Sequence, residues 1–235
     1  MIIDKEKCIG CGECVKFCTV SAIRLKKKKA EIDPKQCAEC GNCLRVKVCP
    51  SDAISQNLQE WPRTIRNIFS DPISVFKETG VSGRGTEEMK TNDVTGRFLK
   101  GEVGFAVDVG RPNGGGIHLR EVEKITRALA PLGVRFEKDS PLTYLFEDPD
   151  RGTLKKEVLD EFVVSAIVEF KTGLDECPKV FHRLEEVSHE LETIFSLGVI
   201  STVDEDGTIP AKVVLEREGI HVAPRGKTNI GLGRR

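Results

Sequence analysis

The sequence predicts an α+β fold in two parts: a small N-terminal unit organised by cysteines, then a split β-α-β sandwich with an antiparallel sheet. Three observations support this. Eight of the nine cysteines lie between residues 8 and 49. After residue 100, apolar residues recur with strand and then with helical spacing. The 235 residues suffice for two small domains that each bury a core. The expected division is 1–56, 57–100 and 101–235.

The N-terminal part is an internal repeat. "IDKEKCIGCGEC" at residues 3–14 aligns with "IDPKQCAECGNC" at residues 32–43, so that Ile-Asp and Cys-x2-Cys-Gly-x-Cys coincide at an offset of 29 residues. Further on, Ala-Ile at residues 22–23 matches Ala-Ile at residues 53–54 at an offset of 31, because "CLRVKVC" has two extra residues. The cysteines therefore occupy equivalent places in two copies of one unit.

The cysteine spacing points to a particular metal chemistry. Three cysteines at Cys-x2-Cys-x2-Cys wrap one face of a small inorganic cluster, and a distant fourth thiolate completes the ligand set. Gly12 and Gly41, each after the second cysteine, let the backbone come close to sulfide. A zinc site uses two cysteine pairs rather than two triplets. A disulfide framework needs an oxidising compartment, which nothing else in the sequence suggests. The pattern indicates iron–sulfur clusters.

Residues 1–56 resemble the bacterial two-cluster ferredoxins. The resemblance implies two 4Fe–4S clusters in which the fourth cysteine of each run serves the other cluster. Carried over, one cluster takes Cys8, Cys11, Cys14 and Cys49, and the other takes Cys37, Cys40, Cys43 and Cys18. Thr19 departs from the family, which has proline after the fourth cysteine. The spacer in "CLRVKVC" departs too, with five residues in place of three, and we expect the extra residues to bulge outward.

Composition excludes several functions. The formal net charge is −1, with 39% hydrophobic and 31% charged residues. A chain that binds nucleic acid or a membrane surface usually has a basic surplus, so neither role is expected. No apolar run is long enough to span a bilayer. The start "MIIDKEKC" lacks an apolar signal core, so we expect a cytoplasmic protein.

The run Lys26–Lys29 indicates a solvated hairpin turn, with a docking patch for an acidic redox partner as the alternative.

Two segments are candidates for binding an anion or another small ligand. After short helical turns expected to pack on the cysteine-rich unit, residues 81–102 are polar and punctuated by glycine. Arg84 and Arg97 stand there beside glycines, as anion capture requires, although an exposed linker fits equally. The second candidate is the loop 110–116. Its backbone N–H groups at Gly114, Gly115 and Gly116 could cradle an anion before a helix, with a flexible connection as the alternative.

The C-terminal part is predicted to run strand–helix–strand–strand–helix–strand, with both helices on one face of the sheet. The expected elements are "EVGFAVDVG", the helix from Leu119 to Leu132, "GVRFE", "EFVVSAIVEF", the helix from Val180 to Ile194, and final strands "GVISTV" and "AKVVLE". Cys177, before a proline at a helix start, is expected to be a buried or idle thiol, with a reactive thiol at the helix N-terminus as the alternative. An exposed sheet edge could pair two copies into a homodimer.

Two further resemblances concern this part. Its element order resembles the small-ligand regulatory domains called ACT domains, at the level of fold alone. "NDVTGRFLKGEVGFAVDVGRP" and "LREVEKITRALAPLGVRFE" are similar to a stretch of 6-hydroxynicotinate reductase, an anaerobic iron–sulfur enzyme that reduces an aromatic heterocycle. This resemblance supplies no catalytic residue.

The function expected from the sequence is electron transfer. Low-potential electrons would pass through two 4Fe–4S clusters to or from a partner oxidoreductase subunit or ferredoxin. A subunit of an anaerobic reductase and a module that senses redox state or a ligand are the alternatives. Whether the chain is itself an enzyme stays open.

Overall fold

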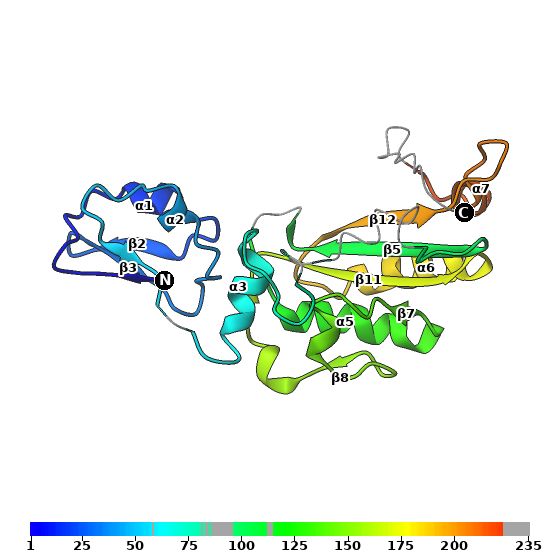
Figure 1. Cartoon of the computed structure of the whole chain (residues 1–235), viewed down its shortest axis with the longest axis horizontal. Coiled ribbons are helices and arrows are strands. Elements are labelled where there is room, and N and C mark those ends of the chain that lie inside the picture. The colour runs from blue at the N-terminus through cyan, green and yellow to red at the C-terminus, as the bar shows by residue number, and fades with distance from the viewer. Residues whose placement is uncertain (58, 81, 83–84, 86–95, 112–114, 223–235) are drawn as a thin grey trace.

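The computed structural model describes residues 1–57, 59–80, 82, 85, 96–111 and 115–222. The chain forms two parts that lie side by side, with helix α3 between them (Figure 1). Each part has its own hydrophobic core. The N-terminal core holds small residues and cysteines, including Ala22, Ala30 and Ala53. The C-terminal core is larger and is built from aliphatic and phenylalanine side chains. The division at residues 56 and 100 remains a prediction.

The N-terminal part consists of short elements. Strand β1 pairs with β4, and β2 pairs with β3, both antiparallel. Helices α1 and α2 occupy equivalent places in the two repeats. The elements are β1 (Ile2–Ile3), α1 (Glu13–Lys16), β2 (Ile23–Lys26), β3 (Lys29–Ile32), α2 (Asn42–Arg45) and β4 (Ile54–Ser55).

The hairpin turn expected at the lysine run is confirmed. Lys26 and Lys29 close the ladder between β2 and β3. Lys27 and Lys28 form the two-residue turn, with φ of 49° and 60°. Two positive φ values give the turn the twist that matches the flanking strands.

Helix α3 (Thr64–Ser70) connects the two parts. Its apolar residues Ile65 and Phe69 belong to the C-terminal core. Its polar residues Arg66 and Asn67 donate hydrogen bonds to backbone carbonyls of the second cysteine run. Of the short helical turns expected to pack on the cysteine-rich unit, α3 contacts it through polar side chains, whereas the one expected at residues 73–76 is not a helix.

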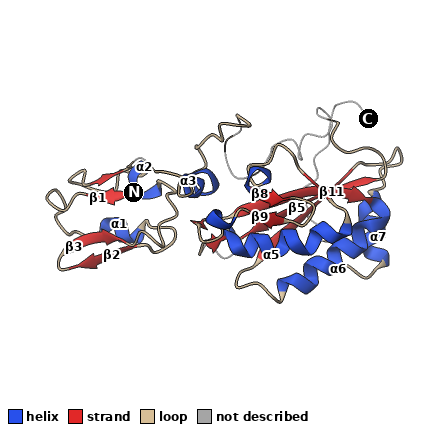
Figure 2. Ribbon diagram, turned by 90° about the horizontal axis from the view of Figure 1, so that it is seen from below, coloured by secondary structure: helices blue, strands red, loops and turns tan. Residues whose placement is uncertain are grey.

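The C-terminal part is built on a four-stranded antiparallel sheet in the order β12-β5-β11-β7. Helices α5, α6 and α7 lie on one face of it (Figure 2). The elements are β5 (Glu102–Val109), β6 (Ile117–His118), α5 (Leu119–Leu129), β7 (Arg135–Phe136), β8 (Phe146–Asp148), β9 (Thr153–Leu154), β10 (Phe162–Val163), β11 (Ala166–Gly173), α6 (Cys177–Ser188), β12 (Phe195–Ser201) and α7 (Pro210–Arg217). The fold is thus α+β, as predicted.

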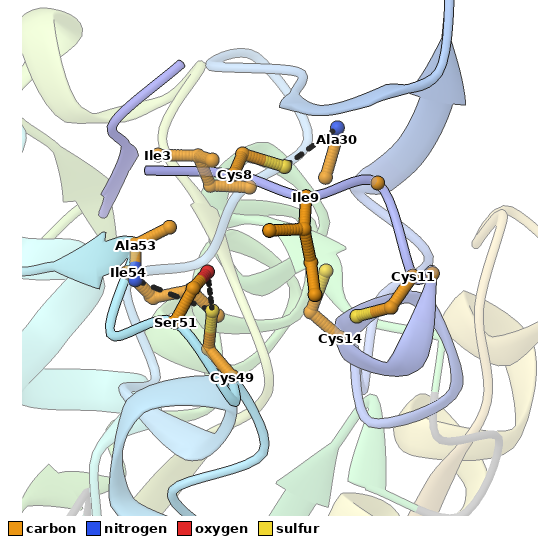
Figure 3. Close-up of a pocket in the computed structure, with 12 residues that line it drawn as sticks. Ile3, Cys8, Ile9, Cys11, Cys14, Ala30, Cys49, Ser51, Ala53 and Ile54 are labelled. Atoms are coloured by element: carbon orange, nitrogen blue, oxygen red, sulfur yellow. Dashed lines mark hydrogen bonds between the residues drawn. The ribbon is translucent and has the colours of Figure 1, made fainter. Parts of the chain in front are cut away.

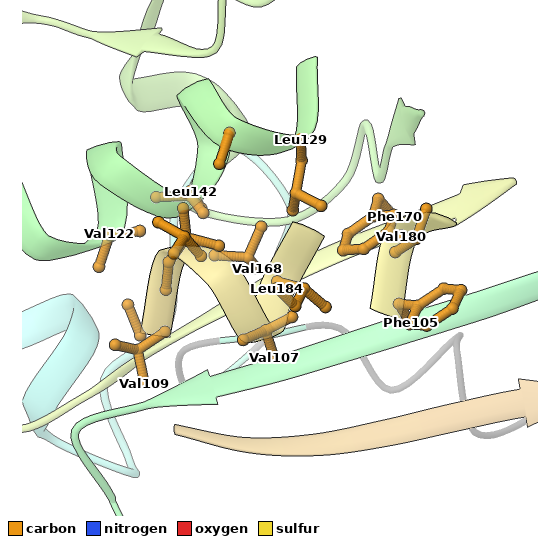
Figure 4. Packing of buried hydrophobic residues seen from close by; sticks show 14 of the residues in the cluster. Phe105, Val107, Val109, Val122, Leu129, Leu142, Val168, Phe170, Val180 and Leu184 are labelled. Carbon is orange, nitrogen blue, oxygen red and sulfur yellow. The ribbon is translucent and has the colours of Figure 1, made fainter. Parts of the chain in front are cut away.

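Alternating side chains of strand β5 form part of the C-terminal core. Val103, Phe105, Val107 and Val109 all point to the helix-covered face and are completely buried. Phe105 stacks on Phe170 of the neighbouring strand β11, with ring centroids 5.1 Å apart. Figure 4 shows Phe105, Val107 and Val109 packed against residues of α5 and α6. The packing of one apolar sheet face against two helices fixes the register of the strands.

Three sequence predictions were wrong in detail. "AKVVLE" is not a strand but helix α7, which begins at Pro210 and buries Ala211 and Leu215, four residues apart on one helix face. The second long helix ends at Ser188, before the expected Ile194, which is exposed. "EFVVSAIVEF" divides into two strands: β10 pairs with β6, and β11 pairs with β5 and β7.

None of the described helices is both long and apolar enough to cross a membrane.

Candidate metal centres

Cysteines from both repeats line one cavity at the N-terminal unit. This cavity is called cavity I, and its four thiols are those of Cys8, Cys11, Cys14 and Cys49. In Figure 3 their sulfur atoms point toward a shared space. Cys8 and Cys14 are buried, whereas Cys11 is exposed. Three thiols therefore come from the first run and one from the second.

A second cavity mirrors the first. Cavity II is lined by the thiols of Cys18, Cys37, Cys40 and Cys43. Here three thiols come from the second run and one from the first. This grouping is the crossed arrangement that the ferredoxin resemblance implies. The assignment of each thiol as a cluster ligand remains a proposal.

Local backbone geometry produces the crossing. Gly12 and Gly41 precede α1 and α2 with φ of 79° and 67°, a conformation that favours glycine. The chain keeps turning after α1, since the Cys18 N–H donates to the Val15 carbonyl over 3.3 Å. Cys14 and Cys18, four residues apart, thus line different cavities.

The extra residues of the second run leave both cavities intact. Lys47, in this spacer, has φ of 48°. Val46 and Lys47 are exposed, so the longer spacer bulges outward as expected. The chain then returns to place Cys49 in cavity I.

Hydrogen bonds to sulfur repeat in the two halves. The Ala22 N–H donates to Cys18 Sγ over 3.1 Å, and the Ala53 N–H donates to Cys49 Sγ over 3.2 Å. Thr19, where the family has proline, places its Oγ1 3.3 Å from Cys40 Sγ. Donors of this kind stabilise negative charge on thiolate sulfur and tune an iron–sulfur centre.

Burial and hydrogen bonds shift the pKa values of some of these thiols. Desolvation, with smaller contributions from Cys40, Cys37 and Cys18, raises the pKa of Cys43 to about 12. Desolvation raises the pKa of Cys14 too. Burial also acts to raise the pKa of Cys49, but hydrogen bonds from Ala53 and Ser51 outweigh it and lower that pKa. Metal ligation requires thiolates, so loading of the cavities releases protons.

The residues present fit 4Fe–4S clusters. Each cavity has four soft thiol donors, N–H groups directed at sulfur, and a glycine where the backbone passes close. Within the described part of the chain, no group of three or more His, Cys, Asp or Glu side chains forms a site for a single metal ion.

Among the described residues, two of the proposed anion-binding residues have other contacts. Arg97 forms ion pairs with Glu137 and, over 2.6 Å, with Asp139. Gly116 instead lies against Phe162 and Val163 of β10. Arg84 and Gly114 are outside the described residues. Gly115 is described and precedes Gly116 in the chain. The ligand site stays a prediction.

Sequence reasoning missed the buried polar contacts beneath cavity II. Arg66 is 6% exposed. Its Nη1 donates to the backbone carbonyls of Pro34, Lys35 and Cys37, over 3.0, 3.0 and 2.9 Å. Its Nε donates to Glu161 of the C-terminal part. No spacing in the sequence could reveal this, because every partner is distant along the chain.

A second ion network lies beside Arg66. Glu39, 1% exposed, accepts hydrogen bonds from the N-terminal amine and from Arg63. Burial acts to raise the pKa of Glu39, but these two cations outweigh it and lower that pKa. The loop between Cys37 and Cys40 is thereby tied to both the chain start and α3.

Comparison with known proteins agrees with this geometry. Residues 7–55 match the family model of the 4Fe-4S dicluster domain. These residues are called the dicluster segment. The match indicates that this segment binds two 4Fe–4S clusters, and it supports an iron–sulfur electron-transfer role. Thirty residues are 53% identical to Ferredoxin-2 of Desulfomicrobium norvegicum, covering 13% of this chain and 51% of that protein.

The match covers a limited part of each protein. The chain spans about half the length of this curated relative. No solved structure matches the chain. The comparisons give no support to the resemblance to 6-hydroxynicotinate reductase. The dicluster segment is therefore the part whose cofactor is established.

Proposed function

We propose that the chain relays electrons in series through its two clusters, between an external redox protein and an acceptor on the side of the C-terminal part. The observation that carries this proposal is the crossed set of thiols lining the two cavities. In the proposal, cavity I uses Cys8, Cys11, Cys14 and Cys49, and cavity II uses Cys18, Cys37, Cys40 and Cys43. Each cluster supplies one reversible, low-potential electron couple.

Short separation supports a relay. Cys14 and Cys18 line different cavities but are four residues apart, so their Cα atoms are at most ~14 Å apart even in a fully extended chain. The Cys18-to-Val15 hydrogen bond makes the separation shorter still. The cavities are also lined by small buried residues, Ala53 in cavity I and Ala22 in cavity II, which add little bulk beside the thiols.

The contacts of helix α3 support an order for the two clusters in the proposed relay. The loop of the second run bonds to this helix through Arg66 and Asn67. The first run instead packs on the β2–β3 hairpin, through Lys29 and Ala30. Cavity II is thus the exit toward the C-terminal part, and cavity I is the entry from outside. A small ligand at the ACT-like C-terminal part, a homodimer paired at a sheet edge, and a cytoplasmic location stay predictions.

The test is the magnetic interaction between the two reduced clusters. Full reduction of the anaerobically prepared chain should give an electron paramagnetic resonance spectrum broadened and split by spin–spin coupling. Cys11→Ser and Cys40→Ser variants, each holding one cluster, should give simple uncoupled spectra. Two uncoupled spectra from the fully reduced wild-type chain would show that the clusters are too far apart to act in series.

A further inference from the structure

The entry face of the N-terminal part combines exposed apolar side chains with exposed lysines. Ile9, on the lining of cavity I, is 66% exposed, and Cys11 beside it is exposed. Leu25 is 49% exposed and approaches the same loop: its Cδ1 lies 3.1 Å from the Cβ position at Gly12. An electron carrier that docks here reaches the thiol closest to solvent.

The lysine turn is pressed against this loop. The Lys28 carbonyl oxygen lies only 2.0 Å from the position that a Cβ at Gly10 would take, so only glycine fits. Lys29 Nζ donates to the Cys8 carbonyl over 2.5 Å, and the Ala30 N–H donates to Cys8 Sγ over 3.4 Å. The lysines are therefore held at the rim of cavity I rather than on an independent loop.

The charge at this rim is only partly neutralised. Glu31 pairs with Lys5 over 3.2 Å and with Lys26 over 3.8 Å. Among the described residues, neither Lys27 nor Lys28 forms a salt bridge, and both are exposed. Residues 1–56 hold eleven Lys and Arg against seven Asp and Glu, in a chain of net charge −1. The bound clusters add negative charge inside the unit, so the local surface charge decides which partner is attracted.

We propose that Ile9, Cys11, Leu25 and the lysines of turn 26–29 form the docking site for an acidic one-electron carrier protein. This surface is called the basic rim. The proposal rests on the electron-transfer function proposed above. A small apolar centre with a charged border suits a transient redox complex, whose contact area is small and whose encounter is steered by charge. One electron moves from the reduced carrier to the chain, the carrier is oxidised by one electron, and no bond forms or breaks.

The experiment measures second-order electron transfer to the full chain. An acidic flavodoxin, reduced to its hydroquinone, is the probe in stopped-flow mixing at several ionic strengths. The variant Lys27→Glu/Lys28→Glu leaves the Lys29 contact to Cys8 in place. Its rate constant should fall by at least about tenfold at low salt and approach the wild-type value at high salt.

Matched controls test whether the effect depends on where in the protein the charge is changed. Lys179→Glu/Lys212→Glu makes the same charge change at exposed residues of α6 and α7, and its rate constant should stay within about twofold of wild type. Oxidised cytochrome c, a basic acceptor, should react faster with the reduced rim variant than with the reduced wild type. Iron content should be unchanged in both variants, which shows that they fold and load.

Each alternative outcome has a distinct meaning. Equal slowing by both variants, or no salt dependence, overturns the basic rim as the docking site. The chain could instead associate with itself in a salt-dependent way. If the rim variant abolishes that association, this face binds a second copy of the chain, and the proposal is overturned. Reduction by methyl viologen separates the two proposals. If this small mediator reduces both clusters rapidly while the rates with carrier proteins do not depend on charge, the docking site is wrong and the relay proposal stands.

Discussion

Arg66 donates a hydrogen bond from Nη1 to the backbone carbonyl of Cys37, a thiol-bearing residue of cavity II, over 2.9 Å. The same guanidinium pairs with Glu161 in the C-terminal part. One buried side chain therefore joins the candidate exit cluster to the rest of the protein. A buried cation is screened less than the exposed lysines at cavity I, so its charge acts more strongly on the nearby centre.

Arg66→Gln should lower the midpoint potential of the cavity II cluster, by an amount on the order of tens of millivolts. Loss of the cation destabilises the reduced, more negative cluster, and the unpaired Glu161 adds to the effect. The potential is measured by redox titration in a Cys11→Ser background, which retains cavity II. Arg66→Gln/Glu161→Gln removes both charges and should recover part of the shift. An equal shift of the cavity I cluster, measured in a Cys40→Ser background, would contradict this account.

Helix α3 should stabilise the C-terminal part. Residues 101–235 are expected to fold without iron, because their core holds no cavity cysteine. A fragment of residues 60–235 should be more stable still, by roughly 3–6 kcal/mol, since it also buries Ile65 and Phe69. Urea unfolding followed by far-ultraviolet circular dichroism compares the two fragments. Equal urea midpoints for the two fragments would mean that α3 stabilises the dicluster segment rather than the C-terminal part.

The sheet depends on an ionised Glu102. Burial acts to raise its pKa, but Lys171, the Leu99 N–H and Arg135 outweigh it and bring the pKa to about 2. Since the folded pKa is depressed, the stabilisation is present above the unfolded pKa of about 4.3 and is lost as pH falls toward 2. Glu102→Gln should destabilise the 60–235 fragment by about 1–2 kcal/mol at pH 7.

The same variant should behave differently in acid. At pH 3 the carboxyl of the unfolded wild type is largely protonated, whereas that of the folded protein stays mostly ionised. Unfolding then takes up a proton, so the difference in unfolding free energy between wild type and Glu102→Gln should shrink. Lys179 pairs with Glu176 at an exposed position, and Glu176→Gln is the matched control, with little effect at either pH. A difference that stays constant from pH 7 to pH 3 would exclude the ion pairs as its source.

The parts of the fold that sequence predicts are those fixed by local rules. Cysteine spacing indicates how many thiols each cluster can receive, and alternation along Val103–Val109 identifies a strand because one face must be buried. "AKVVLE" misleads because its short apolar run fits either period, and only Pro210 at the helix start favours a helix. Arg66 escapes prediction because its carbonyl partners lie 29 to 32 residues away.

Crossed ligation is the central claim, and single-cysteine variants test it most directly. Cys11→Ser and Cys40→Ser provide reference spectra, because each removes a central thiol of one triplet. Cys49→Ser, compared with them by low-temperature electron paramagnetic resonance and iron and sulfide analysis, should match Cys11→Ser. Cys18→Ser should match Cys40→Ser. Each variant should hold about four iron and four sulfide per chain, against about eight of each in the wild type. The reverse matching, Cys49→Ser with Cys40→Ser and Cys18→Ser with Cys11→Ser, would show that each run ligates its own cluster and would contradict the account.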